Sequence, residues 1–129
     1  MNRFELEAYI AETYNAEKDC PWIKYPNYEV FRHNNNQKWF AVIMDVPKEK
    51  LGLQGDSLLD VVNLKCDSIT IGSLRSESGF FPAYHMNKER WITVALDGSV
   101  SDDMIKMLLD MSFKTTAKTI KKRKISTDK

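Results

Sequence analysis

The sequence contains no long apolar run, and no stretch approaches the roughly 18 apolar residues that a membrane-spanning helix needs. Its first five residues also lack the apolar core of a secretory signal. We therefore expect a cytoplasmic protein with no membrane attachment. The chain has 129 residues, 43% apolar and 29% charged, which is typical of one globular domain. We predict that this domain spans residues 1–124 and that residues 125–129 form a frayed tail.

Cysteine and histidine are scarce, with two of each. Cys20 and Cys66 lie far apart, so we expect free thiols. A structural zinc site needs about four ligands at short spacings, and His33 and His85 supply no such spacing. The sequence also lacks a glycine-rich phosphate loop, a His-Glu-x-x-His motif and a calcium loop. We therefore expect no metal and no cofactor.

Charge is unevenly distributed. Residues 1–100 carry 11 basic and 14 acidic side chains, whereas residues 101–129 carry 8 basic and 4 acidic ones, so the end of the chain has a net charge of +4. Residues 114–124 contain six basic side chains and no acid. A cluster of this kind favours an anionic partner, although lysines at a helix C-terminus also stabilise the helix dipole.

The hydrophobic pattern predicts helices at both ends of the domain and antiparallel strands between them. Asn2 and Glu5 resemble a capping box, Asn34 to Asn36 signal a hairpin turn, and Ser101 is a typical helix cap. Gly79 is expected to close a short helix that Ser68 begins. The predicted helices are 3–15, 68–79 and 102–120, and the predicted strands are 28–32, 38–46, 60–67 and 91–96. The fold class is therefore α+β, with one antiparallel sheet covered on one face by helices.

The run "AYHMNKERW", residues 83–91, raises the question of catalysis. His85 could act as a base, with Cys66 or Ser99 as nucleophile and Asp97 as the orienting group, but nothing in the spacing selects these residues. The alternative is that His85 and Asn87 bond the backbone of the loop before the strand, and we favour it. We predict that the chain is not an enzyme. Tyr84, His85 and Asn87 remain candidates for contact with a ligand.

Residues 79–113, "GFFPAYHMNKERWITVALDGSVSDDMIKMLLDMSF", resemble the signature of the MmcQ/YjbR family. That signature combines a Pro-Gly/Ala-Tyr-His-Met-Asn-Lys motif, a tryptophan-containing strand, Leu-Asp-Gly-Ser and an amphipathic helix. The resemblance implies a CyaY-like α+β fold and DNA binding through a proposed double-wing surface. This chain departs from the pattern at Glu89, which adds negative charge to the motif.

Two functional hypotheses follow. In the first, the protein binds DNA with weak sequence preference, as a monomer or weak homo-oligomer, because clustered cations release counterions from phosphates. Trp91 is expected to be more exposed than Trp39 and could stack on bases. The predicted contacts are Lys88, Arg90, Trp91, Lys114, Lys118, Lys121, Lys122, Arg123 and Lys124, with Lys65 and Arg75 as further candidates. In the second, the chain is a protein- or small-ligand-interaction module with no nucleic-acid role, using a cleft near Tyr84, His85 and Trp91.

Overall fold

The computed structural model describes residues 1–117. Six strands form one antiparallel sheet in the order β1-β2-β3-β4-β6-β5. The predicted α+β class, with helices near both ends of the domain, is confirmed. The elements are α1 (Arg3–Thr13), β1 (Ala16–Asp19), β2 (Glu29–His33), β3 (Trp39–Pro47), the 3-10 helix η1 (Lys48–Leu51), β4 (Leu58–Lys65), α2 (Ser68–Leu74), β5 (Phe80–Pro82), β6 (Trp91–Ala95) and α3 (Asp102–Thr116).

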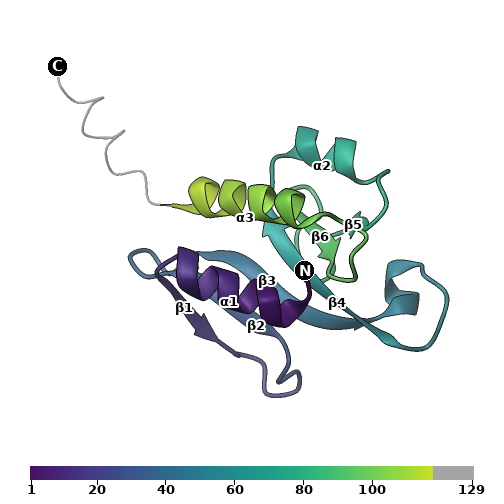
Figure 1. The fold of residues 1–129 in the computed structure, drawn as a ribbon, viewed down its shortest axis with the longest axis horizontal. Helices are drawn as coiled ribbons and strands as arrows, with labels where there is room; N and C mark the ends of the chain where they lie inside the picture. The colour runs from purple at the N-terminus through teal and green to yellow at the C-terminus, as the bar shows by residue number, and fades with distance from the viewer. Residues whose placement is uncertain (118–129) are drawn as a thin grey trace.

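One face of the sheet, which we call the helix face, is covered by α1 and α3 (Figure 1). The capping box of Asn2 and Glu5 is present, and the Ser101 hydroxyl accepts from the Met104 amide, so both predicted helix starts are confirmed. The apolar stripes of the two helices pack on the sheet and form the main core. Its fully buried members include Leu6, Ile10, Ile43, Leu64, Ile92, Ile105, Leu108 and Leu109.

The opposite face, which we call the loop face, is also apolar. Side chains alternate along a strand, so Ala41 and Ile43 of β3 point to the helix face while Val42 and Met44 point to the loop face. Segments outside the strands contribute the half-buried Trp22, Leu51 and Tyr84 to this face, and the strands β3 and β5 contribute Trp39 and Phe81. Burial on both faces explains why β3 and β6 are nearly continuous apolar runs.

Two strands and the C-terminal ends of all three helices differ from the predictions. β1 has the sequence AEKD, is largely exposed and shows no apolar pattern, whereas β5, with the sequence FFP, is too short to show a strand pattern; each lies at an edge of the sheet. The short helix α2 is capped by Asp67 and ends at Leu74, ahead of Gly79. Gly79 instead has a φ of +90° and leads into β5. The last helix, predicted to reach residue 120, ends at Thr116, because Ala117 has an extended backbone; residues 118–129 lie outside the described part of the chain.

Candidate functional site

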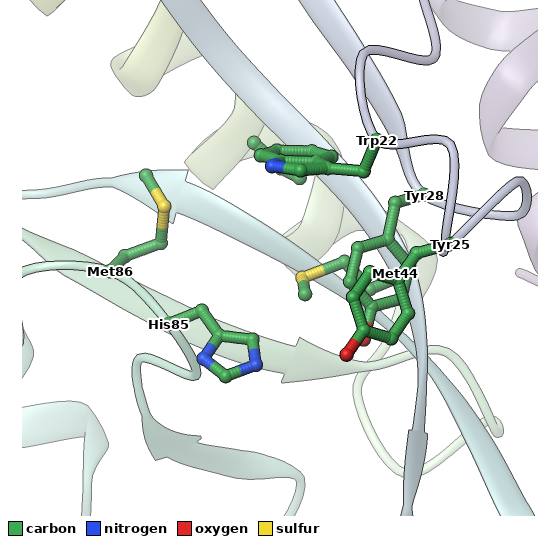
Figure 2. Close-up of a pocket in the computed structure, with 7 residues that line it drawn as sticks. Trp22, Tyr25, Tyr28, Met44, His85 and Met86 are labelled. Carbon is green, nitrogen blue, oxygen red and sulfur yellow. The ribbon is translucent and has the colours of Figure 1, made fainter.

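A cleft of about 330 Å³ opens on the loop face. Two segments far apart in sequence form its walls, with Trp22 and Tyr25 on one side and His85 on the other (Figure 2). Side chains of the sheet form its floor. The complete lining is Trp22, Tyr25, Tyr28, Val42, Met44, His85 and Met86. The cleft is therefore apolar and aromatic, with one imidazole at its edge.

The aromatic wall is preorganised by contacts between its own rings. Tyr25 stacks on Tyr28 with ring centroids 4.6 Å apart and an interplanar angle of 10°. Trp22 meets Tyr28 and Trp39 edge to face, at 5.9 Å and 5.6 Å. The backbone turns back on itself, because the Tyr25 amide donates to the Trp22 carbonyl and the Tyr28 amide to the Tyr25 carbonyl. Aromatic pairs of this geometry hold rings in place beyond what burial alone provides.

The opposite wall is fixed by a buried polar network. Asn63 is fully buried in β4, and its side-chain amide donates to the Tyr84 carbonyl at 3.0 Å. The Thr93 hydroxyl donates to the Asn63 side-chain oxygen and accepts from the Tyr84 amide. The backbone of Tyr84 is thus clamped from both sides. Buried polar groups that are fully paired in this way specify one geometry, so the position of the neighbouring His85 is set by the sheet.

His85 itself adopts a left-handed backbone conformation, with a φ of +63°. This region is uncommon for residues other than glycine and stores backbone strain. Its imidazole is exposed, stands 4.0 Å from the Tyr84 ring and makes no hydrogen bond within residues 1–117. The prediction that His85 bonds the loop backbone is therefore wrong. The ring faces the cleft instead (Figure 2).

Asn87 has the structural role that the sequence predicted for it. Its side-chain oxygen accepts from the Glu89 amide at 2.8 Å, and its carbonyl accepts from the amides of Arg90 and Trp91. These bonds close the turn that leads into β6. Asn87 does not line the cleft.

A second hollow, of about 260 Å³, adjoins the first on the loop face. Tyr84 lines this hollow, and its ring packs on His85, which lines the cleft. Lys50 and Lys88 also line the hollow. An aromatic cleft and a hollow bearing two ammonium groups are thus separated by one pair of rings in contact, tilted at 44° to each other.

Four cationic residues belong to residues 83–91 or contact them, and the side chains of Lys65, Arg75 and Lys88 are placed by their contacts. The Arg75 guanidinium donates to the Lys88 carbonyl at 2.7 Å, and the Lys88 ammonium donates to the Ala83 carbonyl at 3.0 Å. Lys65 lies over the Trp91 ring at 5.7 Å, while the Arg90 carbonyl accepts from the Cys66 amide. We call Lys65, Arg75, Lys88 and Arg90 the cation cluster.

No member of the cation cluster is within 4.0 Å of a carboxylate oxygen among the residues that the structure describes. Trp91, the first residue of β6, is only 8% exposed. It pairs with Lys65 of β4, and the Lys65 side chain lies over its ring. The expectation that Trp91 is the more exposed tryptophan is therefore wrong: Trp22 and Trp39 are both half-buried. Trp91 cannot stack on a base without unfolding part of β6.

Of the basic stripe predicted on the last helix, Lys114 is the one residue that lies within the described part of the chain. Its ammonium pairs with Asp110 at 2.9 Å, and this hydrogen bond lowers the pKa of the Asp110 carboxyl. Lys114 is thus already neutralised by a neighbour on its own helix. The other predicted contacts of this region, Lys118, Lys121, Lys122, Arg123 and Lys124, lie outside the described residues.

The residues considered for catalysis do not converge on His85. Cys66 is buried, which raises the pKa of its thiol, and Asp97 accepts from the hydroxyl and the amide of Ser99 in the turn before α3. None of Cys66, Asp97 and Ser99 lines the cleft. Cys66 and the exposed Cys20 are free, as predicted.

Acidic side chains gather elsewhere, around the buried Arg3. Its guanidinium lies 3.4 Å from Glu7, 3.6 Å from Glu29 and 3.7 Å from Asp60. Burial raises the pKa of Glu29, and the hydrogen bond with Glu7 raises it further. Arg3 supplies the positive charge at this place, and residues 1–117 contain no group of three or more His, Cys, Asp or Glu side chains placed to hold a metal ion.

Comparison with known proteins agrees with the motif of residues 79–113. The YjbR family model matches residues 11–115. The chain belongs to the YjbR family. It is 40% identical to "Uncharacterized protein YyaQ" of Bacillus subtilis (strain 168) over 116 residues, which cover 90% of this chain and 98% of that protein.

Solved structures share the fold. A crystal structure of a Pseudomonas syringae protein superposes with a TM-score of 0.88 at 47% identity and covers 91% of this chain and all of the other. The crystal structure of Deinococcus radiodurans protein DR2400 has a TM-score of 0.66 at 24% identity, with 87% of this chain and 75% of the other covered, and thus shows the shared fold alone. Within the described residues, no helix is long and apolar enough to cross a bilayer.

Sequence reasoning identified one wall of the cleft and missed the other. Tyr84 and His85 were candidates, but Trp22, Tyr25 and Tyr28 were not, because Trp22 and Tyr25 follow no strand or helix pattern and Tyr28 was expected to begin a strand. A signal was present in the density of aromatic residues: three within residues 22–28 of a chain that is 11% aromatic. An aromatic-rich segment without regular structure needs a surface on which to bury its rings, and the loop face provides it.

Proposed function

We propose that this protein is a non-enzymatic DNA-binding protein that contacts phosphates through the cation cluster. The single observation that supports this is the gathering of Lys65, Arg75, Lys88 and Arg90 around one short loop, with no carboxylate paired to them in the described part of the chain. Each phosphate neutralised by such a group releases condensed counterions, which favours binding to any DNA sequence.

The geometry also suits phosphate contact because the loop that bears the cations is held rigidly. The backbone of residues 83–90 receives hydrogen bonds from Arg75, Lys88 and Asn63 and from the amide of Cys66. Cations on a fixed backbone lose less conformational entropy on binding than cations on a free loop. Glu89 in the same loop and the acidic groups around Arg3 reduce the net attraction, so the expected binding is weak and sensitive to salt. The basic residues 118–124 are proposed to add further phosphate contacts.

An electrophoretic mobility titration of the full chain at several salt concentrations tests the proposal. For Lys88→Gln/Arg90→Gln we expect weaker binding and a salt slope smaller by about 2, since each phosphate contact contributes about −0.9 to the slope. Lys38→Gln/Lys106→Gln removes the same charge outside the cluster and should leave the slope almost unchanged. A Lys121/Lys122/Arg123→Ala variant measures the share of the C-terminal residues. No retardation at low salt by micromolar protein would contradict the proposal.

A second candidate function is supported by the cleft. A preformed apolar cleft with one polar group at its edge is a common form of small-ligand site. The alternative is therefore a ligand- or protein-interaction module with no nucleic-acid role. Tryptophan fluorescence against a metabolite panel separates the two functions, because Trp22 lines the cleft and lies outside the cation cluster. A ligand response together with no DNA retardation would favour the module.

A further inference from the structure

The cleft and the cationic hollow form one composite surface on the loop face. The cleft offers stacked aromatic rings and two thioethers, and the hollow beside it offers the ammonium groups of Lys50 and Lys88. The Tyr84 and His85 rings, 4.0 Å apart, lie at the boundary between them. A ligand that fills both would need a flat apolar ring joined to an anionic group.

We propose that the cleft binds an unpaired nucleobase while Lys50 and Lys88 contact the phosphate attached to it. This inference rests on the proposed function and deepens it, since it assigns a preference for unpaired over double-stranded DNA. Bases have a flat π-face that stacks on Trp and Tyr rings with little dependence on sequence. The volume of about 330 Å³ lies at the lower end of the range for small-molecule sites, which suits a single base.

His85 supplies the polar contact that such a site needs. Its imidazole stands at the edge of the cleft with its ring nitrogens free of hydrogen bonds within residues 1–117, so one nitrogen can donate and the other accept. The edge of a base presents both donors and acceptors. The Asn63 and Thr93 network fixes the backbone of the preceding residue, Tyr84, and the left-handed backbone of His85 then directs the ring to the cleft.

Charge complementarity favours a phosphate-bearing ligand over a neutral aromatic one. Lys88 uses one of its three N–H groups on the Ala83 carbonyl and keeps two for an anion. Neither Lys50 nor Lys88 forms a salt bridge with another described residue. The aromatic wall and the two cations thus match the two parts of a nucleotide, whether that nucleotide is free or part of a single strand.

The test compares four probes on the full chain by fluorescence anisotropy and tryptophan quenching: a labelled single-stranded 12-mer, its duplex, an abasic 12-mer with the same phosphates, and AMP. We expect the single strand to bind at least about fivefold more tightly than the abasic strand or the duplex. Tyr25→Ala should remove this preference, because Tyr25 lines the cleft. Phe4→Ala, a change at another exposed aromatic ring outside the cleft, should retain it.

The outcomes separate this inference from the proposed function. Equal binding of single-stranded, abasic and duplex DNA, unchanged by Tyr25→Ala but weakened by Lys88→Gln/Arg90→Gln, would overturn the base site and leave phosphate binding intact. No binding of any polymer, with quenching of Trp22 by AMP that Tyr25→Ala abolishes, would overturn the proposed function and assign the site to a free nucleotide. No response to any of the four probes would overturn both.

Discussion

The two faces of the sheet are buried by different means. On the helix face, α1 and α3 bury a continuous aliphatic layer that includes Leu109 and Ile43 at 0% exposure. On the loop face, irregular segments place half-buried aromatic rings over a smaller apolar layer and leave a cleft. Helices satisfy their own backbone hydrogen bonds, so they can cover a sheet closely, whereas loops need partners for theirs. The fully buried Asn63 meets part of this need on the loop face.

This difference indicates a division of roles. The helix face is expected to carry most of the folding free energy, because aliphatic burial is its main content. The loop face is expected to carry binding, because it combines a cleft, exposed cations and a strained residue. Substitutions on the two faces should therefore separate stability from binding.

The largest effect is expected for Leu109→Ala. Leu109 is fully buried between α3 and the sheet, so the change should lower the free energy of unfolding by about 2 to 5 kcal/mol. Urea denaturation measures the loss. Met107→Ala, two residues away at 50% exposure, is the control and should change stability by less than about 0.5 kcal/mol. A similar small loss for Leu109→Ala would mean that the helix face is not the main source of stability.

Asn63→Ala is expected to lower the free energy of unfolding by about 1 to 3 kcal/mol. The change leaves the Tyr84 carbonyl and the Thr93 hydroxyl without their buried partner. The amide hydrogen of Tyr84 should also exchange faster with solvent, since the Thr93 hydroxyl that accepts from it is no longer held by Asn63. Asn35→Ala, in an exposed turn, should affect neither measurement. Unchanged protection of Tyr84 would show that the sheet does not hold the His85 loop.

His33→Gln is expected to lower the free energy of unfolding at neutral pH by about 1 kcal/mol. His33 is buried on β2, bonds the Thr116 hydroxyl at 2.7 Å and lies 4.3 Å from the Phe113 ring, so it links the end of α3 to the sheet. Burial lowers the pKa of His33 below its usual 6.5. The unfolded chain therefore takes up a proton first as the pH falls.

The stability associated with neutral His33 should consequently be complete above pH 6.5 and should decline as the pH falls below it. Denaturation midpoints of the wild type and of His33→Gln, compared from pH 7.5 to 5, measure this component. The difference between the two proteins should shrink on acidification. The exposed His85→Gln is the control, and an equal acid response in all three proteins would contradict the role of His33.

The smallest effect is expected for His85→Gly, which should raise the free energy of unfolding by up to about 1 kcal/mol. Glycine adopts a φ of +63° without a Cβ penalty, and its greater freedom in the unfolded chain offsets part of the gain. The same variant should bind the single-stranded 12-mer less tightly. His85→Ala retains the Cβ and should lose binding without gaining stability. A stability loss for His85→Gly would show that the imidazole itself supports the loop.

The sequence was sufficient to predict most of the fold. Apolar residues at helical spacing marked α1 and α3, nearly continuous apolar runs marked β3 and β6, and Asn2 and Ser101 marked helix starts by their side-chain chemistry. β1 could not be predicted in the same way. Its residues take up the strand conformation because they pair with β2. This pairing uses the backbone, so the sequence AEKD shows no strand pattern of its own.

The candidate site was predicted in part, for a related reason. Lys65 and Arg75 were further candidates by their charge alone; in the fold Arg75 donates to the Lys88 carbonyl, and Lys65 lies over the Trp91 ring. The burial of Trp91 could not be predicted, because it depends on Lys65 lying over its ring from a strand 26 positions earlier. Long-range registers of this kind are not encoded in local spacing.

The contrast between the two free thiols has a practical consequence. Cys20 is exposed and stands two positions before Trp22, while Cys66 is buried and the pKa of its thiol is raised. A maleimide dye added briefly near pH 7 would therefore attach to one sulfur and spare the other. The natural chain can thus carry a reporter two residues before Trp22, which lines the cleft, without any engineered cysteine.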